Sequence, residues 1–296
     1  MTTSIGFIGL GAMGLPMAKN LLIEQPELKV WNRTMHKAEG LIDLGAEPAG
    51  SPADVATLGG IVISMVSDDQ ALLDVSLGPR GLVGALGPGG IHISCSTVAP
   101  STLSTLAERH AVHGEILVAA PVFGRPDAAA ARKLWILLSG PATATERVTP
   151  LLAPLGQGIH QLGEKIEAAA AMKLAGNFMI LSAVEGMGEA MLLAQRYGVD
   201  REGFADFFGR TLFAGPIYQN YGKQIATRRY QPAGFKLPLG LKDMRLVSQA
   251  AGAVNIPMPL ADLLRNRLLE SVAKKREDYD WTALELSIAE AAGEII

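Results

Sequence analysis

Three glycines near the start of the chain have a spacing that can hold a dinucleotide. Gly9, Gly11 and Gly14 form a GxGxxG pattern that follows an apolar run, SIGFIG, and opens a helical stretch from Ala12 to Ile23. In that context the first glycine permits a tight turn, the second lets a pyrophosphate approach the backbone, and the third allows close packing. The helix N-terminus directs its N–H groups at the phosphates. We predict cofactor contacts at Gly9, Leu10, Gly11, Ala12, Met13 and Gly14.

The end of the next apolar run indicates which dinucleotide is bound. NAD sites place Asp or Glu there to accept hydrogen bonds from the ribose hydroxyls. Here the run KVWNRT puts Asn32 at that place, followed by Arg33 and Thr34. An arginine fork and a threonine hydroxyl can both bind a 2′-phosphate, so these three residues favour NADP(H) over NAD as the cofactor. Further cofactor contacts are expected from the loop after another apolar run, at Met65, Val66 and Ser67.

Lys173 and Asn177 form a second group that can do chemistry. They lie four residues apart in an Ala-rich stretch of good helix formers, so they share one helix face. Burying a lysine there is costly without a purpose. Beside a nicotinamide, an ammonium can protonate the carbonyl oxygen that is being reduced, and a neutral amine can take the alcohol proton in the reverse direction. A lysine that extends to solvent is the alternative that the spacing alone leaves open.

The elements that must position these residues differ between the two halves of the chain. In the first half, apolar runs such as LKVW, GGIVISMV and KLWILLSG alternate with helical patterns such as PSTLSTLAERHA. This alternation predicts an α/β fold with a mainly parallel, doubly wound sheet. The second half has helical spacing and begins with one long helix. We expect a nucleotide-binding domain at residues 1–162, a connecting helix at 163–197 and a helical domain at 198–296.

Composition narrows the remaining classes of function. The chain has 296 residues, of which 49% are hydrophobic and 19% charged, and its net charge of −3 disfavours a nucleic-acid partner. Polar residues such as Glu185 interrupt the longest apolar region, so no membrane span is expected. A single cysteine, Cys95, fits a reducing compartment and predicts a cytoplasmic protein. The five histidines show no pairing with carboxylates at metal-ligand spacing, so no metal is predicted.

Several motifs, in order along nearly the whole chain, resemble those of the β-hydroxyacid dehydrogenase family. This family includes 3-hydroxyisobutyrate dehydrogenases and glyoxylate/succinic semialdehyde reductases. The first motif is the glycine-rich FIGLGAMGLPMAKN at the start of the chain, and four shorter ones follow it. They are STVAP (Ser96–Pro100), APVFG (Ala120–Gly124), KLAGN (Lys173–Asn177) and FKLPLGLKDMRL (Phe235–Leu246). Several motifs in the right order are far more specific than any one of them alone.

The resemblance implies a Rossmann-type domain, a long connecting helix and an all-helical second domain that often builds a dimer. It implies that Lys173 is the catalytic acid and base and that Asn177 orients the substrate hydroxyl or carbonyl. Ser96 would bind a substrate carboxylate, although a helix N-cap is a second role for a serine at this place. The expected cofactor contacts of this part of the chain are Thr97, Lys242, which also reaches the substrate, and Asp243, which orients Lys242.

The substrate loop departs from the family pattern. Members that act on small hydroxyacids read DAPVSGG, whereas this chain reads AAPVFGR, so Ala119, Phe123 and Arg125 replace Asp, Ser and Gly. Further on, Arg132 replaces another glycine. These changes alter the residues that usually bind the substrate carboxylate. They predict a substrate that is bulkier or less polar than 3-hydroxyisobutyrate. The predicted substrate contacts are Ser96, Val122, Phe123, Gly124, Arg125 and Lys242.

The sequence leaves more than one function open. The first is an NADPH-dependent reductase of short, acid-bearing aldehydes such as succinic semialdehyde or glyoxylate, or an NADP-linked 3-hydroxyacid dehydrogenase. An imine reductase is the alternative, although such enzymes commonly carry Asp or Tyr where this chain has Lys173. A non-catalytic NADP-binding scaffold would have an eroded Lys/Asn pair, and this chain keeps both residues. We expect a homodimer, because the apolar faces of the helical half need cover, and no nucleic-acid or membrane partner.

Overall fold

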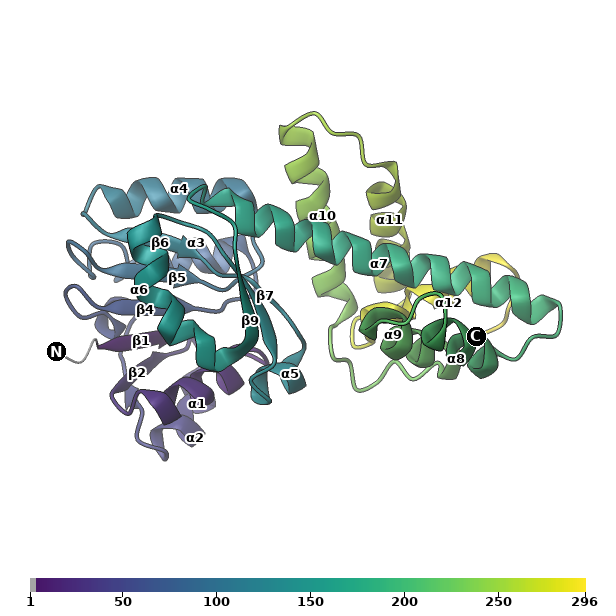
Figure 1. The fold of residues 1–296 in the computed structure, drawn as a ribbon, viewed down its shortest axis with the longest axis horizontal. Coiled ribbons are helices and arrows are strands. Elements are labelled where there is room, and N and C mark those ends of the chain that lie inside the picture. The colour runs from purple at the N-terminus through teal and green to yellow at the C-terminus, as the bar shows by residue number, and fades with distance from the viewer. Residues whose placement is uncertain (1–3) are drawn as a thin grey trace. The chain divides into compact units, whose positions relative to one another are not determined.

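The computed structural model describes residues 4–296 of the chain. The described chain divides into two compact units, one running to Lys173 and the other from Leu174 to Ile296. Figure 1 shows a unit of strands and helices in purple to teal and a unit of helices in green to yellow.

A parallel sheet forms the centre of the first unit. Within residues 4–296 it has six strands in the order β3-β2-β1-β4-β5-β6, so the order reverses between β1 and β4. Every residue of β1, β4 and β5 is buried, because helices cover both faces of the sheet. The expected doubly wound α/β fold is confirmed. The strands are β1 (Ile5–Ile8), β2 (Leu28–Trp31), β3 (Glu47–Pro48), β4 (Ile61–Ser64), β5 (Ile91–Ser94) and β6 (Ile116–Ala119).

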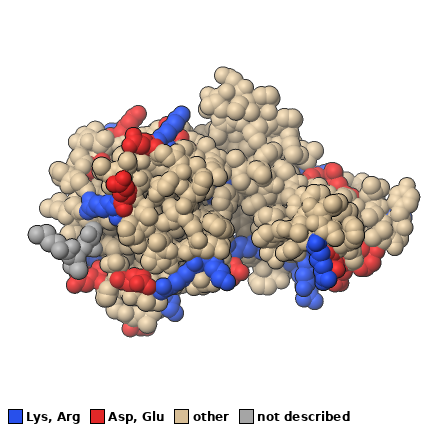
Figure 2. Space-filling model, viewed as in Figure 1, with Lys and Arg blue, Asp and Glu red and all other residues tan. Residues whose placement is uncertain are grey.

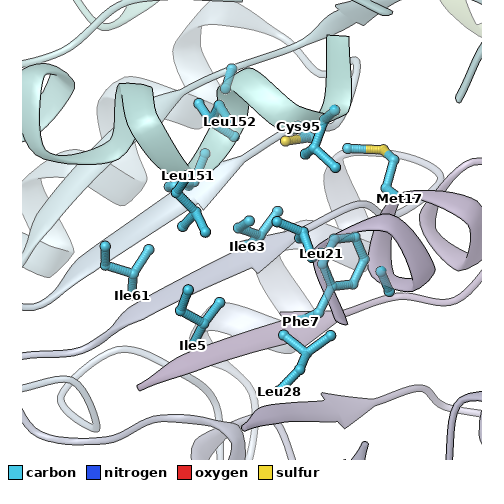
Figure 3. Close-up of a cluster of buried hydrophobic side chains, with 14 of the residues drawn as sticks. Ile5, Phe7, Met17, Leu21, Leu28, Ile61, Ile63, Cys95, Leu151 and Leu152 are labelled. Carbon is cyan, nitrogen blue, oxygen red and sulfur yellow. The ribbon is translucent and has the colours of Figure 1, made fainter. Parts of the chain in front are cut away.

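Two hydrophobic clusters hold helices against the two faces of this sheet. On one face, Phe7 and Ile63 pack with Leu21 of α1 (Gly14–Glu24) and Leu151 of α6 (Ala142–Leu152), as Figure 3 shows. The cluster of the other face joins strand residues to α3 (Asp69–Leu77) and α4 (Pro100–Ala111), and it includes Ala169. Because each strand alternates its side chains between the faces, both clusters draw on the same strands. The short helices of this unit are η1 (Met35–Ala38), α2 (Glu39–Ile42), η2 (Ala53–Val55) and η3 (Ala153–Leu155).

A second, mixed sheet follows the parallel one. Its strands are β7 (Val122–Phe123), β8 (Leu134–Leu138) and β9 (Gly156–Gln161), with α5 (Pro126–Ala130) between β7 and β8. Strand β8 pairs antiparallel with β7 and parallel with β9. The apolar run KLWILLSG predicted the strand β8 but not its place in a separate sheet. Pro121, just after β6, has no N–H to donate to a neighbouring strand. At this point the chain leaves the parallel sheet and enters the second sheet.

The helix α7 (Glu167–Arg196) is 30 residues long and contains the boundary between the two units. The helical unit is completed by α8 (Arg201–Arg210), α9 (Pro216–Thr227), α10 (Leu237–Ala253), α11 (Pro259–Ala273), η4 (Trp281–Ala283) and α12 (Leu284–Ala291). Helix α9 was not expected from the sequence pattern. Pro216 is its first residue, where the fixed φ of proline suits a helix start and no N–H is needed.

A buried carboxylate joins distant parts of the helical unit. Glu285 of α12 accepts hydrogen bonds at Oε1 from Arg201 (2.7 Å) and Arg228 (3.1 Å). Its Oε2 accepts from the Tyr230 hydroxyl at 2.7 Å. Burial, together with the charge of Glu285, raises the pKa of Tyr230 above its ordinary value. Because a buried charge must be paired, the Glu285 carboxylate and its partners fix α8, the end of α9 and α12 to one another.

Helix α7 is, within residues 4–296, the one helix long and apolar enough to cross a membrane by length and composition, and 44% of its most apolar window is buried. Its polar side chains contact other helices of the same unit. Asn177 donates a hydrogen bond to Asp243 of α10, and Glu185 pairs with Arg267 of α11 at 3.1 Å. Such contacts are those of a core helix in a folded domain.

Charges of both signs lie interspersed on the surface in view. Figure 2 shows Lys and Arg side chains next to Asp and Glu side chains, with most of that face uncharged. The formal net charge of −3 agrees with this mixture.

Candidate active site

The glycine-rich turn lies between β1 and α1, at the place where the strand order reverses. Gly9 has a φ of +95°, and a Cβ on it would lie 2.3 Å from the Met65 carbonyl oxygen. A Cβ on Gly14 would lie 1.9 Å from the carbonyl oxygen of Gly9. A Cβ on Gly11 would meet no described atom within 4 Å. The first and third glycines are therefore required by the fold, whereas the second leaves open space where a pyrophosphate can approach.

Asn32 connects this turn to the end of β2. Its Oδ1 accepts a hydrogen bond from the Leu10 N–H at 2.9 Å, and its Nδ2 donates to the Thr34 carbonyl at 2.9 Å. The sequence placed Asn32 where NAD sites carry an acid. In the structure, its amide holds the glycine-rich turn and the Arg33–Thr34 segment together, a role that needs one acceptor and one donor.

A cleft of about 340 Å³ opens beside these segments. Arg33 and Lys37 are exposed residues in its lining and bring two positive charges to one end. Neither an Asp nor a Glu occupies the two residues after β2. The donors and the open space at Gly11 fit a dinucleotide with a phosphorylated ribose. The predicted cofactor residues that line the cleft are Gly9, Gly11, Asn32, Arg33, Thr34, Met65, Val66 and Ser67.

Ser96 fixes the loop that follows β4. Its Oγ accepts a hydrogen bond from the Val66 N–H at 2.9 Å, and the residue is 2% exposed. The N-cap of α4 is Ala99, whose N–H donates to Oδ1 of Asp69 on α3 at 2.8 Å, so Ser96 is not the N-cap. Substrate binding by Ser96 and cofactor binding by Thr97 stay predictions.

The conformation of the substrate loop is fixed by β7, the edge strand of the second sheet. Val122 is buried, and Phe123 pairs with Trp135 on the neighbouring strand. Gly124 follows with a φ of +143°, where a Cβ would lie 2.6 Å from Leu134 Cδ2. Arg125 is half-buried and is the N-cap residue of α5. These local constraints hold Phe123 and Arg125 in place, and their contacts with substrate stay predictions.

Two contacts join the substrate loop region to α1. The Asn20 Nδ2 donates to the Ala129 carbonyl of α5 at 2.8 Å. Arg132, which stands where the family has glycine, has a φ of +59° and pairs with Glu24 at 2.9 Å. Glycine adopts that left-handed conformation without steric cost, which explains the family residue. The Arg132 side chain lies at the surface of α1.

The first turn of α7 is anchored on the nucleotide-binding unit. The Ser104 hydroxyl of α4 donates to Glu167 Oε1 at 2.7 Å, and this bond lowers the pKa of Glu167. The Ala169 N–H donates to Ser139 Oγ at 3.2 Å. One turn later, Lys173 is 8% exposed, and its Nζ lies 4.0 Å from the centroid of the Phe123 ring. The sequence predicted a functional lysine here, and the structure buries it beside the substrate loop.

In the helical unit, Asp243 contacts both Asn177 and Lys242, the other two predicted site residues of this unit. Its Oδ2 accepts from Asn177 Nδ2 at 2.6 Å, and its Oδ1 lies 3.1 Å from Lys242 Nζ. The turn that leads into α10 is held by Asp280, which accepts from the N–H groups of Gly234 and Phe235 at 3.0 Å each. Asp243 therefore orients both an amide and an ammonium. Contacts of Asn177, Lys242 and Asp243 with cofactor or substrate stay predictions.

Sequence reasoning missed a buried chain of polar side chains in the first unit. Ser64 Oγ lies 2.8 Å from His92 Nε2, and His92 Nδ1 lies 2.9 Å from His110 Nε2. His110 Nδ1 then pairs with Glu115 at 2.7 Å, a structural contact that the search for metal-ligand spacing did not identify. Burial lowers the pKa of both histidines. Glu115 stands five residues after His110, beyond the end of α4, and only the chain reversal there brings them together.

No group of three or more His, Cys, Asp or Glu side chains suited to a metal ion occurs among residues 4–296. His110 and Glu115 form a hydrogen-bonded pair instead. Cys95 is buried, which raises its thiol pKa to about 12. A thiol with that pKa is protonated at neutral pH and is a poor nucleophile.

Comparisons with known proteins decide the family. Residues 4–163 match the model described as the NAD binding domain of 6-phosphogluconate dehydrogenase. Residues 168–286 match the model described as the NAD-binding of NADP-dependent 3-hydroxyisobutyrate dehydrogenase. The chain belongs to the β-hydroxyacid dehydrogenase family. Members are NAD(P)-dependent dehydrogenases, so this β-hydroxyacid dehydrogenase is an oxidoreductase whose first unit is an NAD(P)-binding domain.

Similar proteins cover nearly the whole of this β-hydroxyacid dehydrogenase. The uncharacterized oxidoreductase YfjR of Bacillus subtilis is 42% identical over 280 residues, which span 95% of this chain and 98% of that protein. Glyoxylate/succinic semialdehyde reductase 2 of Arabidopsis thaliana is 32% identical over 285 residues, 96% of this chain and 78% of that protein. The structure of Mycobacterium tuberculosis 3-hydroxyisobutyrate dehydrogenase shares the fold, with a TM-score of 0.87, 24% identity and coverage of 97% and 99%.

Proposed function

We propose that this enzyme is an NADPH-dependent reductase of small aldehydes, or a 3-hydroxyacid dehydrogenase in the reverse direction, with Lys173 as general acid and base. The observation that carries the proposal is the burial of Lys173 beside the substrate loop, on a helix turn anchored to the nucleotide-binding unit. A buried ammonium is costly to maintain unless it has partners and a use. Proton transfer to a developing alkoxide is such a use.

NADPH is the proposed cofactor because of the residues at the end of β2. Arg33 and Lys37 offer two cations to a 2′-phosphate, and Asn32 replaces the acid that would bind a free ribose hydroxyl. When bound, NADPH supplies a hydride to the carbonyl carbon. The open space at Gly11 and the N-terminus of α1 would hold the pyrophosphate.

Residues of this chain would perform the proton transfer and the orientation of substrate. In reduction, the Lys173 ammonium donates a proton to the carbonyl oxygen, and in oxidation the neutral amine takes the alcohol proton. Asn177 lies one turn further along α7 and would orient the same oxygen. Asp243 supports this role because it fixes the direction of the Asn177 amide.

The proposed substrates are short aldehydes that carry an acid group. The name of the Arabidopsis relative, glyoxylate/succinic semialdehyde reductase, supports this class. Ser96, Arg125 and Lys242 are the polar residues proposed to bind the acid group. Phe123 makes one wall of the site apolar, and a bulkier substrate than glyoxylate is compatible with it.

The test is NADPH oxidation by the purified protein with succinic semialdehyde and glyoxylate. Lys173→Ala is expected to lower kcat about 10²–10⁴-fold, the usual contribution of general acid catalysis. Lys165→Ala, an exposed lysine just before α7, is the matched control and should keep wild-type activity. A parallel assay with NADH gives the cofactor preference. Aldehyde turnover that does not depend on Lys173 contradicts the proposed mechanism.

Imine reduction is the second candidate, and the substituted substrate loop favours testing it. Phe123 and Arg125 replace the Ser and Gly that the family uses near a carboxylate. A cyclic imine run beside the aldehydes separates the two activities. Imine turnover without aldehyde turnover would show that the substituted loop serves C=N reduction, and the aldehyde proposal would then be wrong.

We also propose a cytoplasmic homodimer. Phe207, Leu212 and Tyr197 of the helical unit are exposed, and a subunit interface would cover such apolar side chains. The single cysteine has no disulfide partner, as expected in a reducing compartment. Sedimentation over a dilution series tests the assembly, and a fully active monomer at every concentration contradicts it.

A further inference from the structure

The Phe123 ring and the Lys173 ammonium form a contact that the family pattern does not contain. Lys173 Nζ lies 4.0 Å from the ring centroid, within the range at which an ammonium is attracted to an aromatic face. The family has serine in place of this phenylalanine, as the motif DAPVSGG shows. Both residues belong to the first unit, and each is held by its own surroundings.

The ring is fixed by local structure. Phe123 ends β7 opposite Trp135, and Gly124 turns the chain away directly after it. The ring packs against the hydrophobic cluster that includes Ala169 and Ala170, from the first turn of α7. The ring and the first turn of α7 therefore pack against the same cluster.

Holding the lysine side chain at one place has an entropic cost that the contact with the ring offsets. The side chain has four rotatable bonds to the ammonium, and their freedom is lost when the group is held at one place. Lys173 is 8% exposed, so water does not provide most of its solvation. An aromatic face attracts the charge as a whole through its quadrupole and does not take up one N–H as a carbonyl would. It can therefore hold the ammonium in position while the N–H groups point elsewhere.

We propose that Phe123 is a positioning residue that holds the Lys173 ammonium over its ring in the orientation needed for proton donation. The inference rests on the proposed function of Lys173. The ring takes no part in the proton transfer itself. Its contribution is to restrict where Nζ can be when a carbonyl oxygen arrives, which lowers the cost of reaching a reactive geometry.

Two variants distinguish the effect of the aromatic face of Phe123 from the effect of its apolar volume. Phe123→Leu keeps an apolar side chain against the cluster but removes the aromatic face, whereas Phe123→Tyr keeps the face. With succinic semialdehyde and glyoxylate, Phe123→Leu should lower kcat roughly 2- to 30-fold, the range that corresponds to a cation–π contact. The reduction should be similar for both aldehydes, with little change in KM, and Phe123→Tyr should restore kcat to within about twofold.

A measurement without turnover reports on the contact directly. In protein labelled with ¹³C-lysine, the ε-methylene signal of Lys173 should be shifted upfield by the ring current of Phe123. The signal is assigned by its loss in Lys173→Arg. It should return to the ordinary lysine position in Phe123→Leu and stay shifted in Phe123→Tyr. Thermal melting of each variant confirms that the fold is intact.

The outcomes are distinct. A ring-shifted lysine signal with no aldehyde turnover by the wild type overturns the proposed function but keeps the contact. An unshifted signal overturns the positioning role, whatever the activity. A Phe123→Leu effect confined to KM, or differing strongly between the two aldehydes, also overturns it and limits Phe123 to the role of an apolar wall of the substrate site.

Discussion

Asn177 Nδ2 donates a hydrogen bond to Asp243 Oδ2 at 2.6 Å, which joins α7 to α10 within the helical unit. The other oxygen of Asp243 lies 3.1 Å from Lys242 Nζ. Asp243 is 1% exposed, so its charge is balanced by these groups rather than by water. A carboxylate can accept hydrogen bonds but cannot donate them. The NH₂ end of the Asn177 amide, rather than its oxygen, must therefore face Asp243.

Replacing Asp243 with alanine should affect both stability and activity. The Asn177 N–H would lose its buried acceptor, which costs about 1–3 kcal/mol of unfolding free energy. Loss of orientation at Asn177 and Lys242 should lower kcat/KM by up to about 10²-fold. Asp243→Asn is the control, since it can still accept from Asn177. Equal losses of stability in the two variants, measured by urea unfolding, would contradict this account.

The glycine-rich turn offers a matched pair of substitutions. Gly14→Ala puts a methyl group 1.9 Å from the Gly9 carbonyl oxygen, so the turn must shift and Tm should fall. Gly11→Ala meets no described atom within 4 Å, so the melting temperature of the cofactor-free protein should stay near that of wild type. Its methyl group would occupy the space proposed for the pyrophosphate, and the Kd for NADPH should rise. Unchanged NADPH binding by Gly11→Ala in a calorimetric titration would place the phosphates elsewhere.

Cofactor preference should depend on Arg33, whereas Asn32 should matter for structure. Arg33→Ala should lower the ratio of kcat/KM for NADPH to that for NADH about 10- to 100-fold, the value of a charge-assisted contact to phosphate. Asn32→Asp, the simple change toward an NAD site, should cost about 1–3 kcal/mol of stability, because it replaces the donor to the Thr34 carbonyl with a second acceptor. A stable Asn32→Asp protein with improved NADH use would refute the structural role given to Asn32.

Stability should fall on mild acidification because of the buried histidines. Burial lowers the pKa of His92 and of His110 in the folded state, so the unfolded chain binds more protons below its ordinary histidine pKa of about 6.5. This contribution to stability is complete above that pH and is lost as the pH falls below it, at up to about 1.4 kcal/mol per pH unit for each histidine.

Urea unfolding between pH 7.5 and 5.5 measures this dependence. His110→Gln removes one titrating group and should flatten the slope, although it also lowers stability at neutral pH. His160→Gln, an exposed histidine on β9, is the control and should keep the wild-type slope. Identical slopes for wild type and His110→Gln would show that another group causes the acid sensitivity.

Much of the fold followed from local pattern. Apolar runs predicted β1, β2, β4 and β8, and β1 and β4 are buried along their whole length, as strands covered on both faces are. Helical spacing in the second half predicted helices there, and α8 (Arg201–Arg210) is one of them. The strands β3 and β7 are two residues long, and so short a segment has no periodicity to detect.

The sequence by itself determined the family, the glycine-rich turn and the Lys173–Asn177 spacing, since each depends on residues that are near neighbours along the chain. Only the tertiary structure decided what those residues contact. Asn177 and Asp243 are 66 residues apart, and Phe123 lies 50 residues before Lys173. Likewise, His110 meets His92 and Glu115 only after α4 packs back on the sheet. Hydrogen bonds and ring contacts act over a few ångströms, so partners that are distant in sequence are fixed by the packing of whole elements.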